Sequence, residues 1–467
     1  MKFKAIAAAL LLLLAQTPQA PTPAQRIDQL QTLLEELRAA LTSPAPAPGG
    51  VTVTDAAGLV AALRNGGSIT VAPGSYAGNF TIAKPTTIAG AGATLLAADG
   101  FTPTLKVAAN DVVVRGLAVQ LGNPDRDAIV VGAADATSAD TQPHRVRFED
   151  VKVLPSAKGG GHRGFALHGS DITLQRVTVL GFYEKGRDSQ AVWICNGPGP
   201  YAVLDSVLEA SGENILIGGA TPGIVGMNPA DITIRGNTIR KPDAFRTLGT
   251  VKNSVEAKIG IRVVVEGNTI DGNWSDGQAG SAIVITARGQ GDCPGCTVDD
   301  VTIRGNTVRR APDGYAVNVL GHDDAGPSGQ LRTLTIDRNL FAESANGIQI
   351  LNGVADALVV TNNTMPRIAG KFLQFSSSPK ILTPITFSRN VLRTGDYGIM
   401  GDGSTGPGLA SLLANARVVE FAGNVIEMSD QRTIPLPTNP GQVLKAGALA
   451  ALLDPSTLKL LAGGAGY

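Results

Sequence analysis

Apolar and polar residues alternate along most of this chain in short segments that repeat one phrase, the sequence motif apolar-x-apolar-x-x-Asn-x-apolar. In 231–239, Ile232 and Ile234 share one face and Thr233 and Arg235 share the other, which is typical of a strand with one buried side. An asparagine stands at the same place in seven copies of the phrase: Asn237, Asn268, Asn306, Asn339, Asn363, Asn390 and Asn424. The pattern predicts one short strand followed by a sharp turn, repeated many times.

The phrase continues upstream, where other residues take the place of the asparagine: Leu117, Val151, Val177 and Ser206. Successive copies lie 24 to 38 residues apart, which is too irregular for heptads or helical pairs. Short strands recurring at this spacing, with Gly-rich connections, indicate the stacked coils of a parallel β-helix. Asparagine tolerates the backbone angles of a tight bend, and stacked amides can bond one another. We therefore expect these asparagines to be scaffold and not catalytic.

The segment 51–92 resembles the beginning of the pectin-lyase-like right-handed β-helix superfamily. In that superfamily a short amphipathic helix caps the open end, and a strand ending in Pro-Gly-x-Tyr starts the first coil. The residues that match the cap are Leu59, Val60, Ala62 and Leu63, and those that match the turn are Pro73, Gly74 and Tyr76. The resemblance covers 51–428. It implies an all-β, single-stranded right-handed parallel β-helix with an N-terminal capping helix and short C-terminal helices.

The ends of the chain predict further segments. Residues 1–20 carry two lysines, an apolar run and small residues, which favours a cleaved export signal over a retained anchor. We therefore expect a secreted, periplasmic or cell-surface protein that does not span a membrane after processing.

Residues 24–43 have a coiled-coil spacing of leucines, and this helix either forms a homo-oligomer or packs on the β-helix. Residues 44–50 form a Pro-rich linker, and 429–467 form a C-terminal cap with short helices expected at 443–453 and 456–461.

Charge balance and cysteine content argue against nucleic-acid binding and against a zinc site. Basic and acidic residues balance at 39 each, which gives no general electrostatic case for nucleic acid. Cys293 and Cys296 form a lone CxxC that cannot complete a zinc site, and in an exported protein a loop disulfide is favoured over reduced thiols. Cys195 is expected to be a small buried residue.

Any chemistry should lie on the outer face, because the interior of such a solenoid is packed. With the aliphatic residues inward, one outward line collects polar residues and an aromatic: His168, Trp193, Asn214, Glu256, Lys258, Thr286, Arg288, Asn318, Gln349 and Gln374. This line is either a solvated sheet face or a surface for a sugar chain. In the second interpretation Trp193, His168, Asn214, Asn318 and Gln349 bind substrate, with an exposed Trp193 ring stacking on a sugar.

In polysaccharide lyases of this fold a Lys or Arg removes the proton beside a uronate carboxylate, while another cation or Ca²⁺ neutralises that carboxylate. The segment 254–268 is distantly similar to the Lys-containing strand of the chondroitinase B and alginate lyase group, without its full motif. The resemblance implies Lys258 as the base. Glu256 points the same way two residues earlier, and Arg262 lies nearby at the start of the next strand. Arg288 of the outward line is a further catalytic candidate. It leaves Ca²⁺ open as a cofactor, and the sequence assigns no metal ligands.

A hydrolase would pair carboxylates instead, and the candidates are Asp188, Glu213, Glu256 and Asp276. The motif sets of polygalacturonases and pectate lyases are absent from the sequence. The amino-acid sequence departs most from the repeated motif at 188–219, and we expect the functional site there.

The sequence thus predicts an exported β-helix that binds, and in one reading cleaves by β-elimination, a uronate-containing polysaccharide. The rival is a non-enzymatic structural or adhesion protein, for example a tailspike-like rod.

Overall fold

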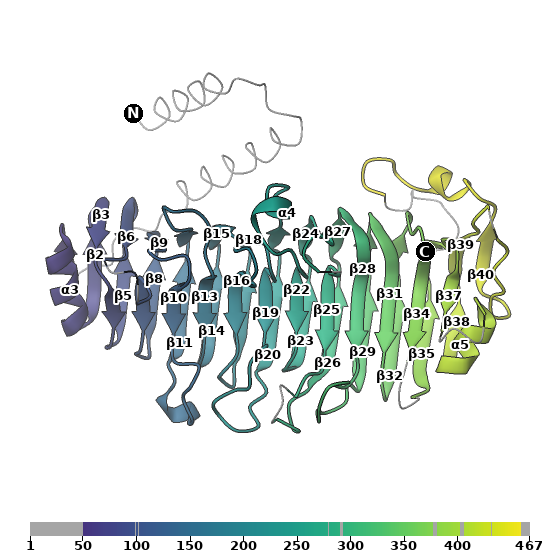
Figure 1. Cartoon of the computed structure of the whole chain (residues 1–467), viewed down its shortest axis with the longest axis horizontal. Coiled ribbons are helices and arrows are strands. Elements are labelled where there is room, and N and C mark those ends of the chain that lie inside the picture. The colour runs from purple at the N-terminus through teal and green to yellow at the C-terminus, as the bar shows by residue number, and fades with distance from the viewer. Residues whose placement is uncertain are drawn as a thin grey trace, which may run out of the picture. The chain divides into compact units, whose positions relative to one another are not determined.

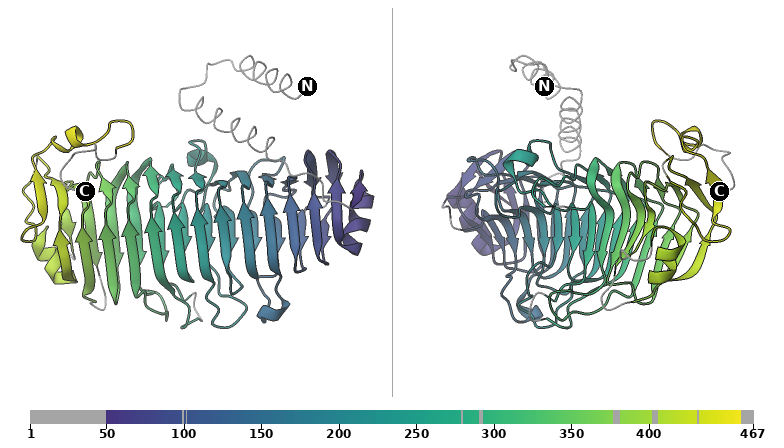
Figure 2. Two further views of the ribbon diagram at one scale, coloured as in Figure 1. Left: turned by 180° about the vertical axis from the view of Figure 1, so that it is seen from behind. Right: turned by 45° about the vertical axis from the view of Figure 1, so that its right-hand side comes forward.

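The computed structural model describes residues 50–98, 100, 102–278, 280–289, 293–376, 381–401, 406–430 and 432–458. The expected export signal (1–20), the helix at 24–43 and nearly all of the linker (44–50) lie outside the described residues. Within them, strands form three parallel sheets, and each coil except those at the two ends contributes one strand to each sheet. The strands stack side by side from α3 to α5 (Figure 1), and the view from behind shows the same stack (Figure 2).

Sheet 1 receives the first strand of each coil. Its strands, in order, are β1 (Val51–Val53), β2 (Gly67–Val71), β5 (Thr86–Ala89), β8 (Val112–Arg115), β11 (His144–Glu149), β14 (Ser170–Gln175), β17 (Tyr201–Leu204), β20 (Ala230–Arg235), β23 (Gly260–Glu266), β26 (Val298–Arg304), β29 (Thr333–Asp337), β32 (Ala357–Thr361), β35 (Thr383–Ser388) and β38 (Ala416–Ala422).

Sheet 2 follows sheet 1 after a short turn. Its strands are β3 (Gly74–Ala77), β6 (Ala93–Leu96), β9 (Ala118–Gln120), β12 (Lys152–Leu154), β15 (Thr178–Phe182), β18 (Val207–Ala210), β21 (Thr238–Arg240), β24 (Thr269–Asp271), β27 (Thr307–Arg309), β30 (Leu340–Phe341), β33 (Thr364–Met365), β36 (Val391–Arg393), β39 (Asn424–Glu427) and β40 (Gly441–Leu444).

Sheet 3 is reached from sheet 2 through loops of variable length. Its strands are β4 (Phe80–Ile82), β7 (Leu105–Val107), β10 (Asp127–Val131), β13 (Arg163–Leu167), β16 (Gln190–Ile194), β19 (Ile215–Ile217), β22 (Val255–Ala257), β25 (Ile283–Thr286), β28 (Ala311–Leu320), β31 (Ser344–Leu351), β34 (Lys371–Ser376) and β37 (Gly398–Met400). Aliphatic and phenylalanine side chains from all three sheets fill one continuous interior.

The helices among the described residues are short: α3 (Ala56–Asn65), α4 (Phe245–Leu248), α5 (Leu409–Asn415) and the 3₁₀ turns η1 (Ala139–Thr141) and η2 (Leu449–Leu452). None of them is long and apolar enough to cross a bilayer. The capping helix α3 begins where the Asp55 side chain accepts a hydrogen bond from the Gly58 amide (2.7 Å), and it buries Leu59, Ala62 and Leu63. Tyr76 is buried and donates to the Ala72 carbonyl oxygen (2.7 Å), so the sequence expectation for this end is confirmed.

The C-terminal region differs from expectation in one respect. A helix was expected from 443, but Gly441–Leu444 forms β40, which pairs with β39 and extends sheet 2. Leu449 and Leu453 then pack against Val391 and Val425. The terminal coil is therefore covered by a strand and a 3₁₀ turn, and its β-branched valine at 443 favours the strand.

The seven asparagines form a continuous buried ladder at the turn between sheets 1 and 2. From Asn268 onward, the Oδ1 of each asparagine accepts from both the backbone N–H and the Nδ2 of the asparagine one coil earlier, at 2.9–3.2 Å. The ladder extends backwards through Ser206, whose amide donates to Asn237 Oδ1 and whose Oγ accepts from Val177 N. The scaffold role predicted for these residues is confirmed.

Asn306 lies within the ladder, and we expect Asn306→Ala to lower the free energy of unfolding by about 3 kcal/mol. The substitution deletes the hydrogen bonds to Asn339 and Val265 and leaves the buried Asn268 donors without their acceptor. Urea denaturation followed by circular dichroism measures the change. The control is Asn318→Ala on the outer face, expected within about 0.5 kcal/mol of the parent. Equal losses in both variants would contradict a special role for the ladder.

Candidate functional site

Strand register brings much of the predicted outward line together on sheet 3. Trp193, Glu256, Asn318, Gln349 and Gln374 stand at one register position, interrupted by Leu216 on β19 and Val284 on β25. Their sequence neighbours on either side, such as Val192 and Ile194, belong to the interior. The outward assignment of this row is therefore confirmed.

A second outward row lies at the start of the same strands. Asp127, Arg163 and Gln190 pair across β10, β13 and β16. The register continues to Glu213, two residues before Ile215 of β19, and to Asn253, two residues before Val255 of β22. These positions adjoin the loops that connect sheet 2 to sheet 3, where Asp188 and Lys252 lie.

Five charged residues meet at this edge, and we call them the carboxylate cluster: Asp188, Glu213, Lys252, Glu256 and Lys258. Lys252 Nζ lies 2.6 Å from Asp188 Oδ2 and 3.9 Å from Glu213 Oε1. Lys258 Nζ lies 3.5 Å from Glu256 Oε1. These residues lie in or next to strands β16, β19 and β22, which are neighbours in sheet 3 (Figure 1). Four of the five residues predicted as catalytic thus come together.

Glu213 is the most enclosed member of the cluster. Its side chain is 1% exposed, and Oε2 accepts from Gln190 Nε2 (2.8 Å). Oε1 is buried and makes no hydrogen bond with any described residue. Burial, followed by the nearby Glu256 and Asp188 carboxylates, raises the pKa of Glu213 because each disfavours its ionised form. Glu213 is therefore a buried carboxyl group disposed to hold a proton.

The lysines of the cluster are partly exposed and paired. Burial alone would lower the pKa of Lys252, but its hydrogen bond to Asp188 and the nearby Glu213 raise it. Glu256 also accepts from Asn253 Nδ2 (2.8 Å). In the described part of the chain, no group of three or more His, Cys, Asp or Glu side chains is arranged to hold a metal ion.

Beneath the cluster, Lys241 is fully buried and donates through Nζ to the carbonyl oxygens of Ala210 and Gly212 and to Asn214 Oδ1. Burial lowers the pKa of Lys241 to about 7, while the nearby Glu213 raises it. Three acceptors match the three N–H groups of an ammonium ion. Lys241 thereby fixes the backbone turn that carries Glu213.

Asn214 does not belong to the outward row, and that expectation is wrong. Its side chain is fully buried, with Nδ2 donating to the Leu208 and Arg240 carbonyl oxygens. Asn214 precedes β19, where the loop has not yet adopted strand alternation. Arg288 lies on the outer surface, but its guanidinium pairs with Asp323 (2.7 Å) and Asp324 (2.8 Å) instead of the cluster. Asp276 likewise pairs with Arg246 (2.9 Å).

The expected exposed Trp193 ring is also contradicted. Trp193 is 8% exposed, because the Arg163 guanidinium covers its ring at 4.0 Å and His168 contacts it edge-on at 4.9 Å. Its Nε1 donates to the Gly218 carbonyl oxygen (2.6 Å). With Ala166, Cys195 and Leu216 it forms a small apolar cluster on the outside of sheet 3. Neither Trp193 nor the 1% exposed His168 offers a free surface to a sugar.

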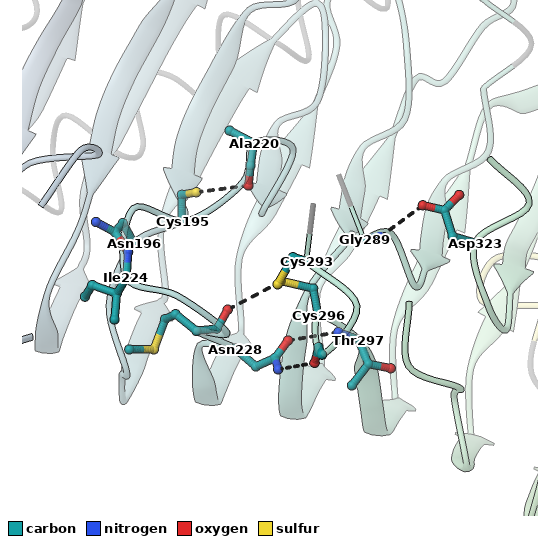
Figure 3. The surroundings of a disulfide bond; sticks show 12 residues. Cys195, Asn196, Ala220, Ile224, Asn228, Gly289, Cys293, Cys296, Thr297 and Asp323 are labelled. Atoms are coloured by element: carbon teal, nitrogen blue, oxygen red, sulfur yellow. Dashed lines mark hydrogen bonds between the residues drawn. A yellow bond between two sulfur atoms is a disulfide. The ribbon is translucent and has the colours of Figure 1, made fainter. Parts of the chain in front are cut away.

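The loops from sheet 3 back to sheet 1 cross-link one another near this cluster (Figure 3). Cys293 and Cys296 form the disulfide favoured from the sequence, and Cys195 is free and buried as expected. The Asn228 side chain holds the disulfide loop by donating to the Gly295 carbonyl oxygen (2.8 Å) and accepting from the Thr297 amide (2.9 Å).

Sequence reasoning missed several site residues. Gln190 lies in the segment where the sequence predicts a site but was given no role, and Arg163 was not singled out as a site residue. Lys241 had a usable signal, since it follows Ile239 by two residues and so falls at an inward position of the alternation. Lys252 and Asn253 lie in a long loop without periodicity, and no sequence signal identified them.

Comparison with known proteins agrees on the fold. No protein-family model matches this chain, and no curated protein sequence matches it. Among solved structures, the catalytic unit of a thermostable GH87 alpha-1,3-glucanase from Streptomyces thermodiastaticus is similar, with 14% identity, a TM-score of 0.50, and coverage of 86% of this chain and 69% of the glucanase.

Two further similar structures are a tailspike protein of the E. coli bacteriophage HK620 and a mannuronic acid specific family 6 polysaccharide lyase from human gut microbiota. The tailspike has 12% identity, a TM-score of 0.46 and coverage of 83% and 64%. The lyase has 12% identity, a TM-score of 0.45 and coverage of 85% and 82%. The three parallel sheets and the likeness to the glucanase identify a right-handed parallel β-helix of the pectin-lyase-like fold.

His168 gives this site a pH-dependent stability. Burial lowers the pKa of His168 to about 4, and its Nδ1 accepts from the Asn196 amide (3.2 Å), which suits the neutral ring. The unfolded chain therefore binds a proton more readily, so this stability is complete above pH ~6.5 and is lost as the pH falls toward 4. We expect His168 to account for about 3 kcal/mol of lost stability at pH ~4.

Urea unfolding at several pH values checks this prediction as the difference between the parent and His168→Gln. The variant should lose part of the pH dependence between about pH 4 and 6.5. The half-exposed His144→Gln serves as the matched control. Identical pH profiles for the parent and His168→Gln would contradict the prediction.

Proposed function

We propose that this protein binds a polysaccharide along the outer face of sheet 3 and cleaves it by acid–base chemistry at the carboxylate cluster. The observation that carries the proposal is the contrast between two carboxyl groups beside one lysine. Glu213 is enclosed and has a raised pKa, whereas Asp188 is 36% exposed and ion-paired with Lys252. A protonated carboxyl group beside an ionised one is the arrangement that glycosidic cleavage requires.

In this proposal Glu213 donates a proton to the leaving oxygen, and Asp188 acts on the sugar carbon or on a water. The Glu213 side chain is 1% exposed and its Oε1 lies 3.9 Å from Lys252 Nζ, so we expect a substrate oxygen to reach it after Lys252 turns toward solvent. Asp188 Oδ2 and Glu213 Oε1 lie 2.6 and 3.9 Å from Lys252 Nζ. Their separation is therefore at most about 6.5 Å, which favours the retaining spacing of ~5–5.5 Å over most of the inverting range.

The polymer-binding part rests on the row that continues beyond the cluster. Asn318 and Gln349 are half-buried, and their amides make no hydrogen bonds with described residues. Amide groups donate to and accept from sugar hydroxyls, and a solenoid presents them at a regular spacing along an extended chain. The alpha-1,3-glucanase that shares the fold has a name that refers to a glucan, and this agrees with a carbohydrate substrate.

β-Elimination of a uronate polymer is the second candidate, with Lys258 as the base. Its support is that Lys258 lies partly exposed (23%) in the cluster, with Lys252 as a further cation. Both lysines, however, are paired with protein carboxylates, which compete with a uronate for them. Hydrolysis is therefore preferred. Export to the cell surface or beyond, based on residues 1–20, remains part of the proposal, as does assembly through 24–43.

We expect Glu213→Gln to lower the cleavage rate by about 10²- to 10⁴-fold, because it removes the proton donor and keeps the shape. The measurement is release of reducing ends from a panel of neutral and uronate polysaccharides, with ultraviolet absorbance recorded for unsaturated products. Hydrolysis gives reducing ends without unsaturation, and Lys258→Ala then retains activity.

The matched control is Glu343→Gln, since Glu343 forms an exposed ion pair with Arg367. Unsaturated products that disappear in Lys258→Ala would favour β-elimination instead. Binding without cleavage of any polymer would leave the adhesion function. Neither binding nor cleavage across the panel would refute the proposal.

The spacing of the carboxyl groups predicts the stereochemistry of hydrolysis. We expect the first product to keep the anomeric configuration of the substrate, as in other double-displacement hydrolases. Proton NMR of the reaction mixture, recorded before mutarotation, distinguishes the two anomers. An inverted first product would place the water between the carboxyl groups and contradict the assignment of Asp188 as nucleophile.

A further inference from the structure

Two hydrogen bonds in series reach Glu213 at Oε2, the carboxyl oxygen that is not the one near Lys252. Arg163 Nε donates to Gln190 Oε1 (2.8 Å), and Gln190 Nε2 donates to Glu213 Oε2 (2.8 Å). Gln190 is 2% exposed, so water does not replace either contact. Arg163 itself is held by Asp127 at 3.5 Å and by the Trp193 ring at 4.0 Å.

We propose that Arg163 and Gln190 are positioning residues that determine which oxygen of the Glu213 carboxyl group carries its proton. An arginine side chain only donates hydrogen bonds. The Gln190 amide must therefore direct its oxygen to Arg163 and its NH₂ group to Glu213. The reversed amide would set two donors against each other at Arg163.

The consequence for Glu213 follows from its two oxygens. Oε2 accepts from Gln190 and cannot also direct a proton toward that donor. A proton on Glu213 is therefore held on Oε1, the oxygen that faces Lys252 and has no hydrogen-bond partner among the described residues. The protonated group directs its O–H toward Lys252, which is partly exposed. The hydrogen bonds from Arg163 through Gln190, which we call the relay, end on the other oxygen, Oε2.

Several charged groups act on Glu213 besides this relay. Asp188 and Lys252 approach from the loops before β16 and β22, Glu256 from β22, and Lys241 from the end of β21. None of these charged groups donates a hydrogen bond to the Glu213 carboxyl group; among the described residues, Gln190 does. That bond favours the ionised form and lowers the pKa of Glu213 against the larger effect of burial. The relay thus opposes the rise in the pKa of Glu213 that burial causes. It also leaves Oε1 as the oxygen that carries the proton.

This inference rests on the proposed function for its purpose, but its test does not require activity. Infrared difference spectra of the parent minus Glu213→Gln, recorded across pH, isolate the carbonyl band of protonated Glu213. In the parent, that carbonyl oxygen is Oε2 and is hydrogen-bonded. We expect Gln190→Leu to shift the band to higher frequency and the titration midpoint to higher pH, because both effects follow from the lost donor.

Arg163→Met provides a second variant that keeps Gln190 in place. Without the guanidinium, the amide can turn and accept a proton from Glu213, so the midpoint should again rise, whereas the band reports a proton on Oε2. Gln175→Leu makes the same exchange on β14 of sheet 1 and should leave the Glu213 signals unchanged. Circular dichroism and thermal melts confirm folding of each variant.

Unchanged band and midpoint in both Gln190→Leu and Arg163→Met would overturn the inference, and so would a lowered midpoint. If the enzyme cleaves a polysaccharide, the alkaline limb of its pH–rate profile should move upward in Gln190→Leu together with the infrared midpoint. Absence of cleavage with the infrared shifts present would refute the proposed function and leave the relay intact.

Discussion

The acceptance of two hydrogen bonds by each ladder asparagine from Asn268 onward is the interaction on which the rest of the structure depends. Oδ1 of Asn268, for example, receives both the N–H and the Nδ2 of Asn237. The same contact recurs through Asn424, so each coil from Asn237 onward is held in one register relative to the next. In a sheet with one buried face, a slip of one residue would exchange inner and outer side chains. The ladder thus prevents the loss of both the core and the outer rows.

The fixed register converts distant sequence positions into neighbours on sheet 3. Gln190, Glu213 and Asn253 are separated by loops of unequal length, yet they occupy the same register position in three successive coils. Variation is confined to the loops, and Lys252 and Asp188 enter the cluster from them. A rigid scaffold with variable loops holds a charged site at low cost in conformational entropy, because the strands are already ordered.

Periodicity predicted the parts of the structure that follow from alternation. It identified the coils, the ladder and the outward positions of Glu256, Lys258, Asn318 and Gln349. It failed at Asn214, where a loop residue was assigned strand alternation. It also failed for Trp193, since alternation reports the face of a sheet and not whether Arg163 and neighbouring loops cover that face. Ion pairs such as Asp188–Lys252 join residues 64 positions apart across a loop, and one sequence holds no signal for them.

The position of the carboxylate cluster along the solenoid has a physical reason. The turn position is apolar at Leu117, Val151 and Val177, then becomes Ser206, and the asparagine ladder begins at Asn237. Glu213 and Lys252 belong to the coils that start at Ser206 and Asn237. A buried carboxyl group and the buried Lys241 need neighbours that cannot move, because a small displacement would leave them without partners in a low dielectric. The first rungs of the ladder immobilise those coils, and Lys241 extends that rigidity by hydrogen-bonding the turn that carries Glu213. A charged cluster farther toward the N-terminal end would lack this support.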